Sequence, residues 1–289
     1  MTDGLLIVDK PAGLTSHDVV SRIRRMAGTR KVGHGGTLDP MATGVLVVGV
    51  GRATRLLTYV VGTGKVYQGT IRLGQSTITD DADGDVVASA DAGHVTASAI
   101  ADGLAAMTGD VDQVPSAVSA IKIKGVRSYH RVRAGEEVTL QARRVRIERI
   151  DVLDIRQVGD LIDVDIEVAC SSGTYIRAIA RDLGAAMDVG GHLTALRRTA
   201  VGKFTIAEAQ PLEEPLRYTP LAEALGHLMP VRAITEDDAR VVRHGGPIAP
   251  SGQPGPYGVI GPDGAALAVM SDRDGKGRPE VVFAHEADE

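Results

Sequence analysis

Apolar and polar positions along the chain follow two spacings that predict a mixture of strands and helices. Short apolar runs and strict alternation predict strands at residues 5–8, 45–50, 65–73, 147–155, 161–168 and 196–204. Apolar residues three and four apart predict helices at 16–26, 52–61, 95–108 and 176–187. Ser16 and Thr174 are the expected N-caps of the first and last of these helices. We therefore expect an α+β fold, with a mixed or antiparallel central sheet flanked by helices.

The pattern changes after residue 210, where Pro211, Pro215, Pro220 and Pro230 mark a linker-like stretch. Beyond it we expect one short helix at 236–244. Brief strands are expected at 258–260, 266–270 and 280–283, separated by turns rich in glycine and proline. We place a domain boundary near Leu228, so that a large domain of residues 1–228 precedes a small β-rich module of residues 229–289.

Composition limits the class of protein. Of 289 residues 43% are hydrophobic, which is enough for a buried core. The single cysteine, Cys170, excludes an internal disulfide and fits a reducing compartment. No apolar run approaches the roughly 20 residues of a membrane span, and the run at 5–8 is too short for a signal peptide. We therefore expect a cytoplasmic protein without a membrane partner.

The net charge of −5 conceals two basic segments. No acid occurs between Val19 and Leu38, and the basic residues there are Arg22, Arg24, Arg25, Arg30 and Lys31. Residues 113–149 carry nine Lys or Arg, among them Lys122, Lys124 and Arg127, against three Glu, a local net charge of +6. Tyr129 lies within this second segment. Basic segments that carry an aromatic residue are typical of RNA binding, although a solvated basic surface has the same composition.

The stretch GHGGTLDP at residues 33–40 is the strongest candidate for a chemical site. Its three glycines permit close approach of another chain, and Pro40 favours an extended conformation of Asp39. Such a loop would present the Asp39 carboxylate in one fixed pose. An ordinary glycine-rich turn, with Asp39 as a solvated cap, is the alternative.

Other motifs are incomplete. The glycines at 49 and 51 lack the third glycine of a dinucleotide fingerprint, and Gly64-Lys65 lacks the remainder of a P-loop. The acidic run at 80–85 fails at both ends of an EF-hand loop, which favours an acidic surface turn. Spacing leaves open whether Arg177 pairs with Asp182 or points into a site.

Several blocks together resemble the TruB-type pseudouridine synthases. They are DKPxGxTS at 9–16, GHGGTLDPxATGVL at 33–46, KxY at 65–67 before LG at 73–74, QVP at 113–115 with SAIK at 119–122, GTYIR at 173–177 and LRRT at 196–199. They run in family order over most of residues 4–204, and the C-terminal module resembles the family's small RNA-binding PUA domain. Ser116, Gly35 and Arg55 depart from residues common in the family, but none of these departures removes a catalytic group.

The resemblance implies isomerisation of the T-loop uridine of tRNA to pseudouridine. In this reaction the glycosidic C–N bond is broken, the base is rotated and a C–C bond is made. Nothing is added or lost, so the resemblance implies no metal, nucleotide or redox cofactor, and it implies no protein partner. The partner is the T arm of tRNA, held by the basic residues, with the segment at 113–149 as a clamping insertion.

The resemblance also implies the roles of single residues. Asp39 corresponds to the catalytic carboxylate, which attacks the sugar or the base or assists cleavage and deprotonation, and Arg177 to its ion-pair partner. Tyr67 would stack on the target base, Tyr175 would line the pocket and His34 would wedge into the RNA loop. Lys10 completes the expected substrate-binding set. For both tyrosines a place in the core is the alternative, and for the whole chain it is a non-catalytic RNA-binding or folding-assistance protein.

Overall fold

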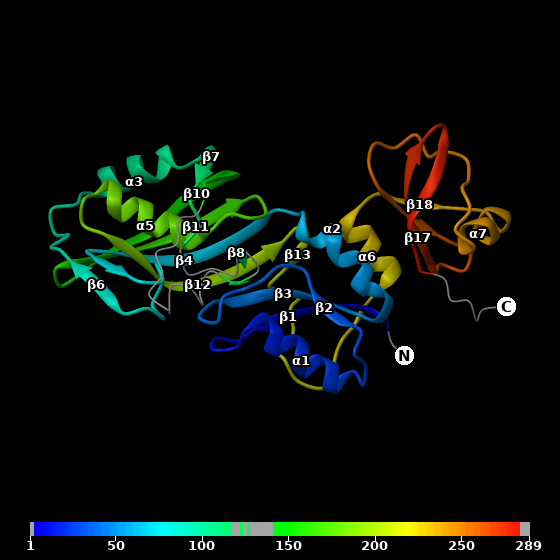
Figure 1. Ribbon diagram of the computed structural model, residues 1–289, viewed down its shortest axis with the longest axis horizontal. Coiled ribbons are helices and arrows are strands. Elements are labelled where there is room, and N and C mark those ends of the chain that lie inside the picture. Colours follow the sequence, from blue (N-terminus) through cyan, green and yellow to red (C-terminus); the bar gives the residue numbers. More distant parts are fainter. Residues whose placement is uncertain (1–2, 117–121, 124–125, 128–140, 284–289) are drawn as a thin grey trace. The chain divides into compact units, whose positions relative to one another are not determined.

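The computed structural model describes residues 3–116, 141–283 and the backbone of 122–123 and 126–127. The chain divides into two compact units. The first comprises Met1–Leu38, Val45–Val61 and Gly202–Glu289, and the second comprises Asp39–Gly44 and Gly62–Val201. The described residues form a large mixed sheet, mainly antiparallel, with few helices (Figure 1), so the predicted α+β class is confirmed.

The N-terminal part of the first unit is a small sheet covered by a helix. Its elements are β1 (Gly4–Lys10), α1 (Ser16–Met26), β2 (Val32–His34), β3 (Thr43–Val50), the 3-10 helix η1 (Gly51–Leu56) and α2 (Leu57–Val61), with β13 (Phe204–Thr205), β14 (Thr219–Pro220) and α6 (Leu221–Leu228) from later in the chain. Strand β1 lies between β14 and β3, and β2 runs antiparallel to β3. Helix α1 buries Val19, Val20 and Ile23, the apolar stripe predicted from the sequence.

Helix α1 spans the predicted residues 16–26, but its N-cap is one residue earlier than we predicted. Its N-cap is Thr15, whose hydroxyl accepts a hydrogen bond from the Asp18 N–H, while the Asp18 carboxylate accepts from the Thr15 N–H. Ser16 is buried instead. Its hydroxyl accepts from the N–H of Leu38 at 2.8 Å and donates to the Leu38 carbonyl at 3.1 Å. Ser16 therefore fixes the backbone directly before Asp39.

The second unit is built on a long sheet with helices packed against it. Its elements are β4 (Lys65–Leu73), β5 (Gln75–Thr77), β6 (Val86–Ser89), α3 (Ala97–Ala106), β7 (Gly109–Gln113), β8 (Lys122–Ile123), β9 (Val126–Arg127), β10 (Arg143–Val158), β11 (Leu161–Cys170), α5 (Ile176–Ala186) and β12 (Gly191–Val201). The order β12-β4-β11-β10-β7 is antiparallel throughout. The first residues of β3 add a parallel pairing to β12, which makes the sheet mixed. Helix α5 contacts β12 and β4, and α3 contacts α5 and β10 (Figure 1).

Apolar and acidic residues alternate along β11, which gives the strand one apolar face and one charged face. Ile162, Val164, Ile166 and Val168 are buried, as the period of two predicted. The acids between them face basic partners on neighbouring strands, in the pairs Asp163–Arg72, Asp165–Arg156 and Glu167–Arg149. Pairs of opposite charge across strands stabilise a sheet modestly, so this face needs no apolar cover.

The C-terminal residues form a second sheet. Its elements are β15 (Val231–Ala233), α7 (Glu236–Arg243), β16 (Tyr257–Ile260), β17 (Ala266–Arg273) and β18 (Lys276–Val282), and the strands lie in that order. Buried residues of α7, β16 and β17 pack into one core, which includes Val242, Tyr257 and Met270. The helix and the three strands predicted for this module are present. The boundary near Leu228 stays a prediction.

Three further expectations are wrong in detail. The stretch expected to be linker-like contains β14 and α6, because Pro220 caps α6 and Ala224 and Leu225 bury its apolar face. The expected helix at 52–61 is a 3-10 turn followed by a short α-helix. Helix α5 has Tyr175 as its N-cap, since the Thr174 hydroxyl donates to the carbonyl of Ser171 instead.

Candidate active site

An ion pair joins Asp39 to Arg177 within the second unit. Asp39 lies in the segment before β3, and Arg177 lies in the first turn of α5. Arg177 Nε is 3.0 Å from Asp39 Oδ2. The Arg177 side chain is only 6% exposed, whereas that of Asp39 is 37% exposed. A buried guanidinium thus holds a carboxylate that solvent and a ligand can reach, and Asp182 pairs with Arg181.

Close packing at Gly44 fixes the loop that carries Asp39. Gly44 has φ +99°, and a Cβ there would lie 2.2 Å from the carbonyl oxygen of Arg198. Gly44 and Thr43 pair with Arg198 and Arg197 of β12. Arg197 also donates to the Thr43 hydroxyl at 3.2 Å. The carboxylate therefore projects from a loop held against a central strand.

Arg177 is itself held by a group that sequence reasoning missed. Its Nη1 lies 3.4 Å from Asp81 Oδ2 and donates to the Thr79 carbonyl at 2.9 Å. Asp81 is only 4% exposed, so the expected acidic surface turn is wrong at this residue. Burial raises the pKa of Asp81, and the Thr79 hydroxyl and the Arg177 guanidinium act against this rise. One buried guanidinium is thus shared by two carboxylates.

A second arginine lies one turn further along α5. Arg181 is 3.6 Å from Asp80 and 2.8 Å from Asp182, and it donates to the carbonyls of Val114 at 2.8 Å and Pro115 at 3.4 Å. Burial raises the pKa of Asp80, opposed by a hydrogen bond from Ser116 and by the charge of Arg181. Arg181 therefore ties the residues after β7 to α5.

Strand β12 brings Tyr67 to the same place as the Asp39 loop. Arg198 is in register with Tyr67 on one side and with Gly44 on the other. Burial raises the pKa of Tyr67, a hydrogen bond and the charge of Arg198 lower it, and the negative charge of Asp39 adds to the rise. Asp39 thus lies close to both Arg177 and Tyr67, which is the arrangement that the family resemblance implied.

The pKa values of two buried side chains are strongly shifted: Lys65 at the start of β4 and Cys170 at the end of β11. Burial lowers the pKa of Lys65 to about 8, and the positive charge of Arg198 adds to this effect. Burial raises the pKa of the Cys170 thiol to about 11. The Lys65 ammonium donates to the Thr63 carbonyl at 2.6 Å. The strand that carries Tyr67 therefore begins at a largely dry position.

The other predicted substrate-binding residues have different surroundings. Tyr175 is half-buried, and its backbone exchanges hydrogen bonds of 2.8 and 3.1 Å with the Gln113 side chain. Lys10 and His34 belong to the first unit. Lys10 is fully buried and donates to the carbonyls of Pro11 and Leu14, whereas His34 is half-buried in β2. Their roles toward a substrate stay predictions.

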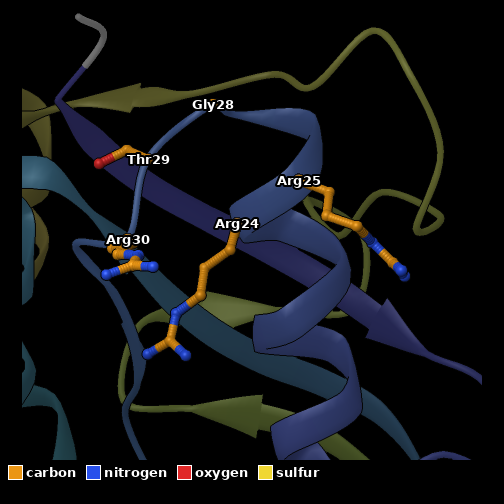
Figure 2. Close-up of a pocket in the computed structure, with 5 residues that line it drawn as sticks. All are labelled: Arg24, Arg25, Gly28, Thr29 and Arg30. Atoms are coloured by element: carbon orange, nitrogen blue, oxygen red, sulfur yellow. The ribbon is translucent and has the colours of Figure 1, made fainter.

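Basic residues of the last turn of α1 and of the loop after it lie around an open pocket of about 620 Å³. Arg24, Arg25 and Arg30 line it together with Gly28 and Thr29 (Figure 2). The guanidinium groups of Arg24 and Arg30 extend to the same side of the helix, and Arg25 extends to the other side (Figure 2). Arg24 donates to the Val32 carbonyl at 3.1 Å. None of these three arginines forms an ion pair with an acid among the described residues.

The remaining predicted RNA contacts are only partly described. Arg22 is exposed on α1, and Lys31 is exposed before β2. The backbone of Lys122 and Arg127 forms the pair β8–β9, and Lys124 and Tyr129 lie outside the described residues. In the described part of the chain, no helix is long and apolar enough to cross a membrane.

Comparisons with known families give matches along the chain. The model described as "TruB family pseudouridylate synthase (N terminal domain)" matches residues 24–176. Models of a "tRNA pseudouridylate synthase B C-terminal domain" and of "tRNA Pseudouridine synthase II, C terminal" match residues 177–229 and 229–284. The tRNA pseudouridine synthase B of Thermobifida fusca (strain YX) is 56% identical and covers 98% of this chain and 99% of the relative. That of Mycobacterium sp. (strain KMS) is 55% identical over 97% of this chain and 96% of the relative.

Solved structures with a similar fold are also known. A chain in the structure of an H/ACA RNP bound to a substrate RNA containing 2'-deoxyuridine superposes with a TM-score of 0.73 at 23% identity. The match covers 98% of this chain and 86% of that chain. A chain of a Cbf5-Nop10-Gar1 complex gives a TM-score of 0.70 at 25% identity, covering 98% and 84%.

Proposed function

Because the chain belongs to the TruB family of pseudouridylate synthases, enzymes that form pseudouridine in tRNA, we propose that it modifies the T-loop uridine with Asp39 as catalytic carboxylate. One observation carries the proposal. The Asp39 carboxylate lies 3.0 Å from the buried Arg177 guanidinium and is still 37% exposed. It is the group in this cluster that combines a fixed negative charge with access for a substrate.

The reaction needs an anion at the target nucleotide. Breaking the glycosidic bond and joining the sugar to C5 of the base requires a group that attacks the sugar or base, or that assists cleavage and removes the C5 proton. Arg177 favours the ionised form of a neighbouring carboxylate. Because Asp81 and Thr79 hold the other side of Arg177, the guanidinium keeps its orientation when the substrate enters.

The base must leave its stack before the glycosidic carbon is reached, at a cost of a few kcal/mol. A T-loop uridine lowers this cost, because single-stranded loops expose their bases. We propose that Tyr67 stacks on the extruded base, since the tyrosine lies beside Arg198 and the charge of Asp39 raises its pKa. Tyr175, His34 and Lys10 complete the proposed substrate-binding set.

The arginines of α1 and of the loop that follows it are assigned to the RNA backbone. Arg24 and Arg30 present two guanidinium groups to one side of an open pocket, which suits a phosphate. Arg22, Arg25, Lys31 and the basic segment at 113–149 extend this surface. Residues 1–228 would carry the chemistry and residues 229–289 would form a second, PUA-like RNA-binding module. A cytoplasmic location stays a prediction.

The position of the product tests this proposal. An unmodified tRNA transcript is incubated with the protein, and pseudouridine is mapped at each uridine. We expect product at the T-loop uridine and none in a transcript that has cytidine there. Product elsewhere would overturn the assigned substrate. Tight binding without product would instead favour the rival interpretation, an RNA-binding or tRNA-folding protein.

A further inference from the structure

Ser116 occupies a buried position beside Arg177, the ion-pair partner of Asp39. It is 0% exposed and lies three residues after the end of β7. Its hydroxyl accepts from Arg177 Nη1 at 3.3 Å, and its one proton is shared between the Thr79 carbonyl, at 3.1 Å, and Asp80. Arg177 Nη1 also donates to the same Thr79 carbonyl, so the three groups close a ring of hydrogen bonds.

The surrounding residues fix the serine in this place. The two residues before it, Val114 and Pro115, are bound through their carbonyls by Arg181. Gln113 holds the start of α5 through the backbone of Tyr175. The chain from Gln113 to Ser116 is therefore attached to α5 at both of its ends, and the hydroxyl cannot follow Arg177 if the guanidinium turns away.

We propose that Ser116 is a positioning residue for pseudouridine formation, whose hydroxyl holds the Arg177 guanidinium with Nε directed at Asp39. The inference rests on the proposed role of Asp39. Nη1 has two hydrogens, and three acceptors surround it: Ser116, the Thr79 carbonyl and Asp81. These three acceptors contact Nη1, whereas Asp39 contacts Nε, so the two sets of contacts together set the plane of the guanidinium. Without the serine, Nη1 keeps the Thr79 carbonyl at 2.9 Å and the longer contact to Asp81 at 3.4 Å, so the plane is held less firmly.

The effect on catalysis follows from geometry. Small displacements of a catalytic group lower the rate steeply, while substrate binding made by other residues is unaffected. A Ser116→Ala variant should therefore lose about tenfold in kcat, the scale of one hydrogen bond to a charged group. Its KM for tRNA should stay within about twofold. Ser116→Thr keeps a hydroxyl and should recover most of the loss.

The decisive arm is a double-mutant cycle with Arg177→Lys. Lysine keeps the positive charge but has no Nη1 for the serine to hold. If Ser116 acts through Arg177, Ser116→Ala should change the single-turnover rate less than about twofold in the Arg177→Lys background. Ser171→Ala is the matched control, because that serine lies in the same unit and accepts from a backbone N–H. Its kcat should equal that of the wild type.

Three outcomes would overturn the inference: kcat of Ser116→Ala within twofold of the wild type, an effect on KM alone, or the same loss in both backgrounds. Thermal melting of each variant shows whether it is folded. If Ser116→Ala does not fold, the same rates are measured with Ser116→Cys, whose thiol is a weak acceptor of similar size, and the same three outcomes apply. Asp39→Asn is assayed in parallel. If Asp39→Asn is inactive and Ser116→Ala has normal kinetics, this inference alone is overturned. If Asp39→Asn is active, the proposed function is overturned.

Discussion

Replacing Asp81 by asparagine removes one of the two carboxylates beside the Arg177 guanidinium and leaves the side-chain volume almost unchanged. In the native protein both side chains of the Asp81–Arg177 pair are 6% exposed, and their charged atoms are 3.4 Å apart. Asparagine can still accept hydrogen bonds from the Thr79 hydroxyl and from the N–H of Asp83, the two groups that contact Asp81 Oδ1. The substitution therefore removes the charge opposite Arg177 and puts an amide NH2, a donor, in place of the acceptor Oδ2.

The size of the effect follows from this contact. A hydrogen bond to a charged group contributes about 1.5–3 kcal/mol, and a buried pair is not screened by solvent. If that energy orients Arg177 for catalysis, its loss lowers kcat by about 10- to 100-fold, since 1.36 kcal/mol corresponds to a factor of ten. Affinity for tRNA should change little, because Asp81 is buried and does not reach the RNA.

Single-turnover formation of pseudouridine on an unmodified transcript measures the rate, and filter binding measures the affinity. Asp85→Asn is the matched control, because it makes the same change of charge at an exposed position of the same turn. A folded Asp81→Asn variant with a rate within twofold of the wild type would refute the view that Arg177 is oriented from its buried side. So would an equal loss in Asp85→Asn.

Three further perturbations test other parts of the structure. The lowered pKa of Lys65, about 8 against an ordinary 10.5, means that the unfolded state binds more protons between these values. The free energy of unfolding of the wild type, measured with denaturant, should therefore rise by about 3 kcal/mol relative to that of Lys65→Met between pH 8 and 10.5. Parallel pH profiles of the two proteins would contradict this. Gly44→Ala forces a Cβ against the Arg198 carbonyl at positive φ, so thermal melting should show a loss of stability of at least about 1 kcal/mol. An unchanged Tm would be inconsistent with the loop geometry. Affinity for tRNA should fall steeply between about 50 and 200 mM salt. Arg24→Ala and Arg30→Ala should each reduce the slope of log affinity against log salt concentration by about one. Slopes equal to that of the wild type would exclude phosphate contacts at these two residues.

Local patterns predicted most of the elements. The alternation of β4 and β11 and the apolar stripes of α1 and α5 were readable because each is a short-range consequence of burial on one side. Helix ends were less predictable. Thr15 and Ser16 are both good N-cap residues, and the tertiary contact of Ser16 with Leu38 decides between them. Pro220 similarly marks the start of α6 rather than a linker.

The candidate site shows the limit of sequence reasoning more clearly. Asp39 was recognisable from its glycine-rich loop, and Arg177 from the family motif. Asp81 was not, because its burial depends on a turn in which Asp80 has φ +58° and on a bridge to Leu193 of β12, far along the chain. Nothing local distinguishes Asp81 from the exposed acids that follow it. Ser116 likewise gains its partners only when α5 packs beside the end of β7.

The central claim is that the Asp39 carboxylate carries out the isomerisation. Formation of the new C–C bond releases the hydrogen at C5 of the uridine, so tritium release from tRNA labelled at that position measures the reaction directly. We predict that Asp39→Asn releases no tritium above background while its Kd for tRNA stays within a few-fold of the wild-type value. Release by Asp39→Asn at a rate near that of the wild type would contradict the account.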